Sequence, residues 1–192
     1  MVLQRERLYT VEEFEVIADA EENADRLLEL IDGEIVEKMP TEFHGQVVLN
    51  IGGEFNAYAR RTKIGRAGTE VRHRKLEDRY NSRIPDVSFR ITSDPAIERG
   101  SVGGMPDVAV EIQSPDDDLE KLRGKIRYYL LNGTRLGILV LTKRRIVEVH
   151  TKEGVRILSE ADTLDGGDVM PGFTMPVKDI FYDPVSDRAN ED

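Results

Sequence analysis

The sequence predicts an α/β (α+β) fold in which a mixed central β-sheet is flanked by helices. Three observations indicate this fold. A capped helical segment, three strand-like segments, a second capped helix and further strands follow one another along the chain. The segment RLGILVLT, after the second helix, is almost entirely apolar and reads as a buried strand. With 192 residues, of which 39% are hydrophobic, the chain is long enough to bury a sizeable core.

The first elements are predicted from local signals. Thr10 followed by Glu13 is a capping-box pattern and predicts the start of a short helix. Asp32-Gly33 is the turn pair of a two-residue hairpin within the alternating segment LLELIDGEIVEK. A helix is then expected in FHGQVVLNIGGEFNAYARR, where Gly52 and Gly53 either weaken it or mark a close packing contact. Its apolar residues at helical spacing are Val47, Val48, Ile51, Phe55 and Tyr58.

The later elements follow in the same way. Strands are expected near residues 67–76, 84–91 and 106–113. Three aspartates at 116–118 offer an N-cap to the helix LEKLRGKIRYYLLNG, which ends at Asn132-Gly133. RLGILVLT and RRIVEVHT are expected to pair as a hairpin, whereas the tail that contains Gly166, Gly167, Pro171 and Gly172 is expected to be irregular. We expect one domain over residues 1–192, with a core at about 10–181 and a frayed, flexible C-terminal tail.

Composition excludes some classes of protein and leaves others open. The chain has no cysteine, so it has no disulfides or thiolate chemistry, which fits a reducing cytoplasm. No apolar run is long enough for a membrane span. The net charge is −10, yet residues 60–90 contain ten Lys/Arg against four Asp/Glu, a local balance of +6. This segment is either a basic face for a nucleic acid or an ordinary solvated edge.

Two strand-like segments carry acids where apolar residues are expected. In PDVAVEIQSP, Asp107 and Glu111 alternate with Val108, Val110 and Ile112, and SRIPDVSFR carries Asp86. A buried carboxylate is unfavourable unless a partner compensates it. One interpretation is a solvent-facing side of a half-exposed sheet. The other is a functional site.

Strand geometry decides which of these acids can act together. Asp107 and Glu111 are four residues apart, or about 13 Å along a strand, too far to share one small ion. Asp86 and Glu111 can share an ion if their strands are neighbours, about 4.8 Å apart. Asp107 is then expected to be structural. Lys125 lies at the edge of the apolar face of the next helix, so its ammonium is expected either to reach Glu111 or to turn to water.

Taken together, ELIDGEIVEKMP, RIPDVSF, PDVAVEIQSP, KIRYYLLNG and LGILVL resemble the Uma-type restriction endonucleases, a branch of the PD-(D/E)-x-K nuclease superfamily. The resemblance extends from about Thr10 to Phe181 and implies a restriction-endonuclease-like core. It implies that Asp86 and Glu111 are catalytic acids that bind Mg²⁺ or Mn²⁺ with the carbonyl of Ile112. Gln113 stands where the superfamily has its lysine, and the resemblance implies that Lys125 replaces that lysine.

The resemblance also implies secondary candidates and partners. Glu34 matches an acid of the hairpin and is either a ligand or a solvent-facing residue, and His44 matches a family histidine. The implied substrate is DNA, cut with the help of a divalent ion that neutralises the phosphate and activates water. The residues expected to contact phosphates are Arg60, Arg61, Lys63, Arg66, Arg72, Arg74 and Lys75.

Two functions remain open from the sequence. The first is a magnesium-dependent endonuclease acting as a homodimer, with GFTMPVKDIF as a candidate interface segment. The second is a degenerate nuclease fold that serves as a binding or assembly module, which Gln113 and the acidic net charge favour. A third possibility, an unrelated small-molecule hydrolase, is disfavoured because the chain has no nucleophile motif such as G-x-S-x-G.

Overall fold

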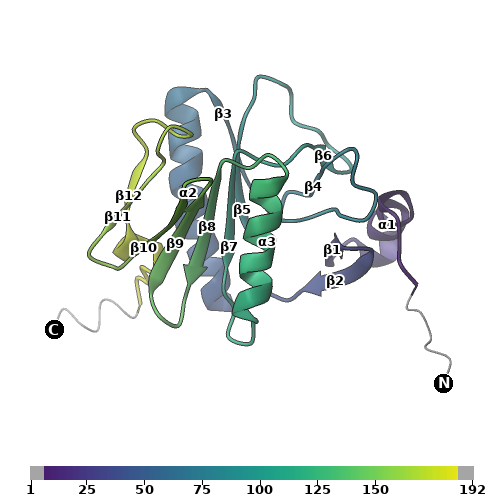
Figure 1. Cartoon of the computed structure of the whole chain (residues 1–192), viewed down its shortest axis with the longest axis horizontal. Helices are drawn as coiled ribbons and strands as arrows, with labels where there is room; N and C mark the ends of the chain where they lie inside the picture. Colours follow the sequence, from purple (N-terminus) through teal and green to yellow (C-terminus); the bar gives the residue numbers. More distant parts are fainter. Residues whose placement is uncertain (1–6, 186–192) are drawn as a thin grey trace.

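The computed structural model describes residues 7–185 of the chain (Figure 1). Its helices are α1 (Val11–Ala18), the 3-10 turn η1 (Glu21–Asn23), α2 (Glu42–Thr62), α3 (Leu119–Leu131) and α4 (Val177–Ile180). Its strands are β1 (Leu27–Ile31), β2 (Glu34–Lys38), β3 (Gly65–Thr69), β4 (His73–Arg74), β5 (Val87–Ile91), β6 (Val102–Gly103), β7 (Val108–Ile112), β8 (Leu136–Leu141), β9 (Ile146–Thr151), β10 (Gly154–Leu158), β11 (Thr163–Asp165) and β12 (Thr174–Pro176).

A six-stranded mixed sheet with the order β10-β9-β8-β7-β5-β3 forms the centre of the fold. Strands β7 and β8 are parallel and are joined through α3, whereas the other neighbouring pairs are antiparallel. Helices α2 and α3 lie on opposite faces of this sheet (Figure 1). The predicted fold, a mixed central sheet flanked by helices, is therefore confirmed.

The face covered by α2 holds the main apolar core. Val47, Ile51, Phe55 and Tyr58 of α2 are buried there against the alternate residues of β5, β7, β8 and β9 that point to this side. Burying one such side chain contributes about 1.5–3 kcal/mol. Gly52 is a close contact, because an added Cβ would lie 3.3 Å from Cγ2 of Thr69. This core fixes the strands whose opposite faces carry the polar groups described below.

Helix α3 packs closely on the other face. Asp118 caps it by accepting hydrogen bonds from the backbone N–H groups of Glu120 and Lys121. Its approach requires Gly137 in β8, because a Cβ there would lie 2.7 Å from Cγ2 of Ile126. The helix thereby holds its side chains against β7 and β8.

The β1–β2 hairpin lies beside the central sheet and is held to it by a short segment. Asp32 and Gly33 both have positive φ, at 51° and 87°, as the predicted two-residue turn requires. Leu30 and Ser82 exchange backbone hydrogen bonds of 2.8 and 2.9 Å, which attach β1 to the chain that leads into β5. Helix α1 covers the hairpin and starts with the predicted capping box at Thr10.

Two expectations from the sequence are wrong. The tail is not irregular throughout: residues 166–173 lie outside helices and strands, as expected, but β11, β12 and α4 on either side of them pack on the main core, where Leu164, Val177 and Phe181 are buried. Most apolar side chains of GFTMPVKDIF are therefore buried within the chain, which leaves little apolar surface on this segment for a partner. The expected fraying concerns mainly residues 186–192, which lie outside the described residues.

The second correction concerns the polar sides of β5 and β7. Ser88 and Ala109 are 4% and 0% exposed, and the acids beside them are buried as well. The interpretation as a solvent-facing side of the sheet is thus wrong, because α3 and the hairpin cover it.

In residues 7–185 no helix has the length and apolarity needed to cross a membrane.

Candidate active site

Asp86 and Glu111 occupy facing positions on adjacent strands. Asp86 directly precedes β5, and the register pairs Val87 with Val110, which places Asp86 opposite Glu111. This is the neighbouring arrangement that two acids need to share an ion. Both carboxylates are almost fully buried, with residue exposures of 2% and 1%.

Each oxygen of Asp86 has its own partners. Oδ2 accepts a 2.7 Å hydrogen bond from the backbone N–H of Ile112 and lies 3.2 Å from Nε2 of His44. Oδ1 forms an ion pair with Lys38. Burial alone would raise the pKa of Asp86, but Lys38 and His44 hold that pKa well below its ordinary value.

Glu111 is held more weakly by its surroundings. Its Oε1 accepts a 2.7 Å hydrogen bond from the hydroxyl of Tyr129, and its Oε2 lies 3.3 Å from Nζ of Lys125. Burial raises the pKa of Glu111, and the attraction of Lys125 and Lys38 does not offset it. Tyr129 is buried beside this carboxylate, which raises the pKa of its hydroxyl well above the ordinary value.

A third acid, Glu29 of β1, joins these two and was not predicted from the sequence. Its Oε2 lies 2.6 Å from Nζ of Lys125, and its Oε1 accepts a 2.7 Å hydrogen bond from the backbone N–H of Ile84. The residue is fully buried. The sequence could have indicated Glu29, because the segment LLELI places an acid within an apolar strand just as VAVEI does.

The second unpredicted residue is Lys38, the last residue of β2. Its ammonium donates a 3.0 Å hydrogen bond to the carbonyl of Ile84 and pairs with Asp86. Burial would lower the pKa of Lys38, but Glu111, Asp86 and Glu29 raise it far above its ordinary value. The pKa of Lys125 is also raised, since Glu111 and Glu29 outweigh its burial. Both ammonium groups thus remain charged.

We call these residues the ionic cluster: Glu29, Lys38, Asp86, Glu111, Lys125 and Tyr129. It combines three carboxylates with two ammonium groups, drawn from β1, β2, the chain before β5, β7 and α3. The carboxylate side chains are 1–3% exposed, whereas those of the two lysines are 14–15% exposed. The lysines therefore form the part of the cluster that meets solvent.

The donors of the ionic cluster fit a magnesium ion. Carboxylate oxygens are the ligands that Mg²⁺ prefers, and one or two carboxylates suffice because waters and substrate phosphates complete its shell. Asp86 and Glu111 supply such a pair from facing positions. No ready-made cage of three or more His, Asp or Glu ligands occurs within residues 7–185.

The other predicted site residues lie at varying distances from the ionic cluster. His44 contacts Asp86, as described above. Glu34 is exposed at the start of β2 and is not brought into the cluster. The backbone of Gln113 is hydrogen-bonded to β8 and the residue after it: its N–H donates to the carbonyl of Val140, and its carbonyl accepts from the hydroxyl of Thr142. Asp107 has the expected structural role and accepts a 2.8 Å hydrogen bond from the N–H of Ile91.

The predicted phosphate-contacting residues form two groups. The first is Arg60, Arg61, Lys63 and Arg66, at the C-terminal end of α2 and in β3. The second is Arg72, Arg74 and Lys75, in and around β4. Since a helix rises 1.5 Å per residue, Arg60 lies about 24 Å along α2 from His44. The first group is therefore remote from the ionic cluster.

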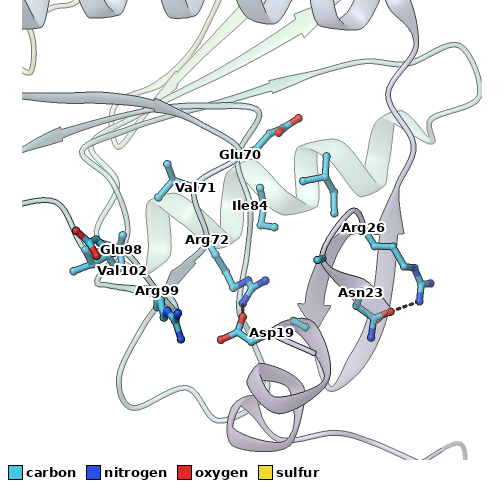
Figure 2. Close-up of a pocket in the computed structure, with 15 residues that line it drawn as sticks. Asp19, Asn23, Arg26, Glu70, Val71, Arg72, Ile84, Glu98, Arg99 and Val102 are labelled. Carbon is cyan, nitrogen blue, oxygen red and sulfur yellow. Dashed lines mark hydrogen bonds and ion pairs between the residues drawn. The ribbon is translucent and has the colours of Figure 1, made fainter. Parts of the chain in front are cut away.

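A hollow of about 660 Å³ is lined by residues that include Ile84 (Figure 2), whose backbone contacts the ionic cluster. The backbone of Ile84 holds Glu29 and Lys38. Three arginines line the hollow: Arg26, Arg72 and Arg99. Figure 2 shows Arg72 directed at Asp19, with which it forms a 2.9 Å ion pair. Of the second basic group, Arg72 thus lines a hollow that shares Ile84 with the surroundings of the cluster.

A separate buried network on β9 offers a contrast to the ionic cluster. Glu148 accepts two hydrogen bonds from the guanidinium of Arg123, at 2.5 and 3.1 Å, and lies 3.0 Å from Nε2 of His150. Arg123, with a smaller opposing effect of burial, lowers the pKa of Glu148. This carboxylate is neutralised by its own immediate neighbours.

The comparisons with known proteins identify the family and the fold. A family model described as Uma2, putative restriction endonuclease, matches residues 11–178. A solved structure of a putative nuclease of DUF820 from Anabaena variabilis is similar with a TM-score of 0.74 and 25% sequence identity, covering 90% of this chain and 97% of that one. A search of curated proteins gives no match. The chain belongs to the Uma2 family of putative restriction endonucleases.

Proposed function

We propose that this protein is a metal-dependent endonuclease that hydrolyses phosphodiester bonds of DNA. The observation that carries the proposal is the convergence of Asp86, Glu111 and Lys125 on one buried point from two adjacent strands and a helix. A nuclease function agrees with the family and with the similar solved structure. The metal, the substrate and the roles of the residues are parts of the proposal.

Asp86 and Glu111 would hold Mg²⁺ or Mn²⁺, together with the backbone carbonyl of Ile112. Such an ion supplies neutralisation of the scissile phosphate and activation of the attacking water. The hydrogen bond from the N–H of Ile112 and the contact with His44 fix the orientation of the Asp86 carboxylate. This leaves Oδ1 as the oxygen of Asp86 that faces the ion.

Lys125 would stabilise the negative charge that develops on the phosphate. Its ammonium is held between Glu29 and Glu111, at 2.6 and 3.3 Å, and stays protonated there. Tyr129 orients Glu111 through its 2.7 Å hydrogen bond. An amide cannot act as a base, so Gln113 is restricted to hydrogen bonding with water or with the phosphate.

The arginines beside the ionic cluster suit an anionic substrate. Arg72 lines the hollow and belongs to the second basic group, so a DNA strand that enters the hollow would meet guanidinium groups near the cluster. Arg60 and its neighbours at the end of α2 would contact phosphates farther along the duplex. Most of the protein surface is acidic in balance, which would orient DNA towards these places.

A second candidate function is a binding or assembly module built on a degenerate nuclease fold. Gln113 favours it, because this residue replaces the lysine of the superfamily pattern. The ammonium groups of Lys38 and Lys125 favour it as well, because they lie between the carboxylates and solvent, where a metal ion would have to bind. A module of this kind would bind DNA or protein without hydrolysing either.

Nicking of supercoiled plasmid separates the two functions. With Mg²⁺ or Mn²⁺ we expect nicking by the wild type, none with EDTA, and a loss of about 10²–10³-fold in Glu111→Gln. Glu148→Gln is the matched control, because Glu148 is an equally buried acid outside the ionic cluster, and it should nick like the wild type. Nicking that persists in Glu111→Gln would defeat the site assignment. A folded wild type that never nicks would favour the module.

The proposal includes a homodimer in the cytoplasm. Two copies of the centre, related by a two-fold axis, would let the protein cut both strands of a duplex in one binding event. The lack of cysteine fits the reducing compartment in which DNA would be met. Light scattering after size exclusion should give about twice the chain mass of 21.7 kDa. A mass of one chain, with and without DNA, would contradict the dimer.

A further inference from the structure

Lys38 occupies a place in the ionic cluster that the proposed catalysis leaves unused. The residue ends β2, and its ammonium is held by Asp86 and by the carbonyl of Ile84. Its side chain is 15% exposed, while that of Asp86 is 3% exposed. The ammonium therefore lies nearer to solvent than the carboxylate that it pairs with.

The bonds of Asp86 leave one oxygen for a further cation. Oδ2 already has two partners, the N–H of Ile112 and Nε2 of His44, which use both of its lone pairs. Oδ1 is the remaining oxygen, and Lys38 holds it. A divalent ion at Asp86 therefore has to bind the oxygen that the lysine now occupies.

The two cations are too close to share this oxygen without strong repulsion. A magnesium ion lies about 2.1 Å from its ligand oxygens, so an ion on Oδ1 would lie within roughly 4 Å of an ammonium paired with the same oxygen. At that separation a monovalent and a divalent charge repel each other strongly in a partly buried site. The attraction to Glu111 and Glu29 also acts on whichever cation is present.

We infer that Lys38 is a displaceable internal counter-ion that competes with the divalent metal for Oδ1 of Asp86, so that metal binding requires the lysine to leave. This inference rests on the proposed function, since it concerns the same metal position. It gives Lys38 a regulatory role: the ammonium neutralises the acids in the metal-free protein and sets the metal concentration at which the site is filled. Lys125, bound by Glu29 and Glu111, keeps its place.

Calorimetric titration of Mn²⁺ at one fixed pH tests the competition directly. We expect Lys38→Met to bind Mn²⁺ about tenfold or more tightly than the wild type, because the competing charge is gone. Lys152→Met, in the exposed turn after β9, removes the same charge far from the cluster and should bind like the wild type. Lys38→Gln retains a hydrogen-bond donor for Asp86 and serves if Lys38→Met does not fold.

The wild type itself provides a second readout. Amine-reactive labelling followed by mass spectrometry should show that Mn²⁺ raises the modification of Lys38 severalfold, with the labelling of Lys152 as internal reference. Unchanged labelling, or equal Mn²⁺ affinity in the wild type and both Lys38 variants, would overturn the competition while the endonuclease proposal stands. If neither the wild type nor the Lys38 variants bind Mn²⁺, both proposals fall.

Discussion

Two buried carboxylates, Glu111 and Glu148, lie in one row across the central sheet. Each faces Leu139 of β8, Glu111 from β7 and Glu148 from β9, so their strands are about 10 Å apart. Both are covered by α3, which supplies a cation to each. The two acids thus share a face of the sheet and a covering helix, and they differ in how strongly burial acts on their pKa and in how their charge is compensated.

The compensation is local for Glu148 and shared for Glu111. Glu148 has the planar fork of Arg123 on both oxygens, and its pKa is lowered. Glu111 has a neutral hydroxyl on one oxygen and, on the other, an ammonium that it shares with Glu29. Its pKa is raised, because burial outweighs these contacts. A buried carboxylate whose charge is not fully compensated can still bind a further cation, and such carboxylates are typical of functional sites.

The contrast between Glu148 and Glu111 should have its largest effect on the free energies of unfolding of Glu148→Gln and Glu111→Gln at pH 7. Glu148→Gln loses the charge-assisted hydrogen bonds of Arg123 and should lower the free energy of unfolding by about 2 kcal/mol. Glu111→Gln leaves two carboxylates facing two ammonium groups in the ionic cluster. Its free energy of unfolding should therefore equal that of the wild type or exceed it by up to about 1 kcal/mol. Urea unfolding measures both values.

Arg123→Lys controls for the geometry of the Glu148 network. It keeps the charge but removes the planar fork, and it should be destabilised less than Glu148→Gln. The comparison fails if Glu111→Gln is as destabilised as Glu148→Gln. Glu111 would then be a structural acid like its neighbour, and the metal site would have to lie elsewhere.

The sequence predicts the strands and the two facing acids because these depend on short-range patterns. Alternation placed Asp86 and Glu111 on one side of their strands, and helical spacing placed Lys125 at the edge of the apolar face of α3. The short-range pattern does not show whether that side of the strands is exposed to solvent or buried. The answer depends on α3 and on the β1–β2 hairpin, which cover it from distant parts of the chain.

Glu29 and Lys38 show where prediction from the sequence ends. Both lie in a hairpin that was predicted, but their contact with the ionic cluster depends on how that hairpin docks. The docking includes backbone hydrogen bonds from Leu30 to Ser82 and back and from Gly33 to Tyr80, and backbone bonds leave no signal in the choice of residues. The tail was misjudged for a related reason, since α4 and β12 gain their stability from packing on α2 rather than from local preference.

The dependence of the two stabilities on pH gives the finest test of the comparison. Both groups have an ordinary pKa of 4.5. The lowered pKa of Glu148 stabilises the fold above that value, and the stabilisation is lost as the pH falls through the folded-state pKa. The raised pKa of Glu111 does the opposite: its contribution is complete below pH 4.5 and is lost as the pH rises through the folded-state pKa.

Relative to the wild type, Glu148→Gln should therefore be less stable at pH 7, and Glu111→Gln equally or more stable. The Glu111→Gln difference should shrink towards zero as urea unfolding is repeated from pH 7 down to about pH 4.5, whereas the Glu148→Gln difference should persist to about pH 4.5 and shrink only below it. They approach zero from opposite sides, because the two shifts have opposite signs. Differences of the same sign at pH 7, or differences that do not change with pH, would mean that both carboxylates are compensated alike and that Glu111 has no unmet need for a cation.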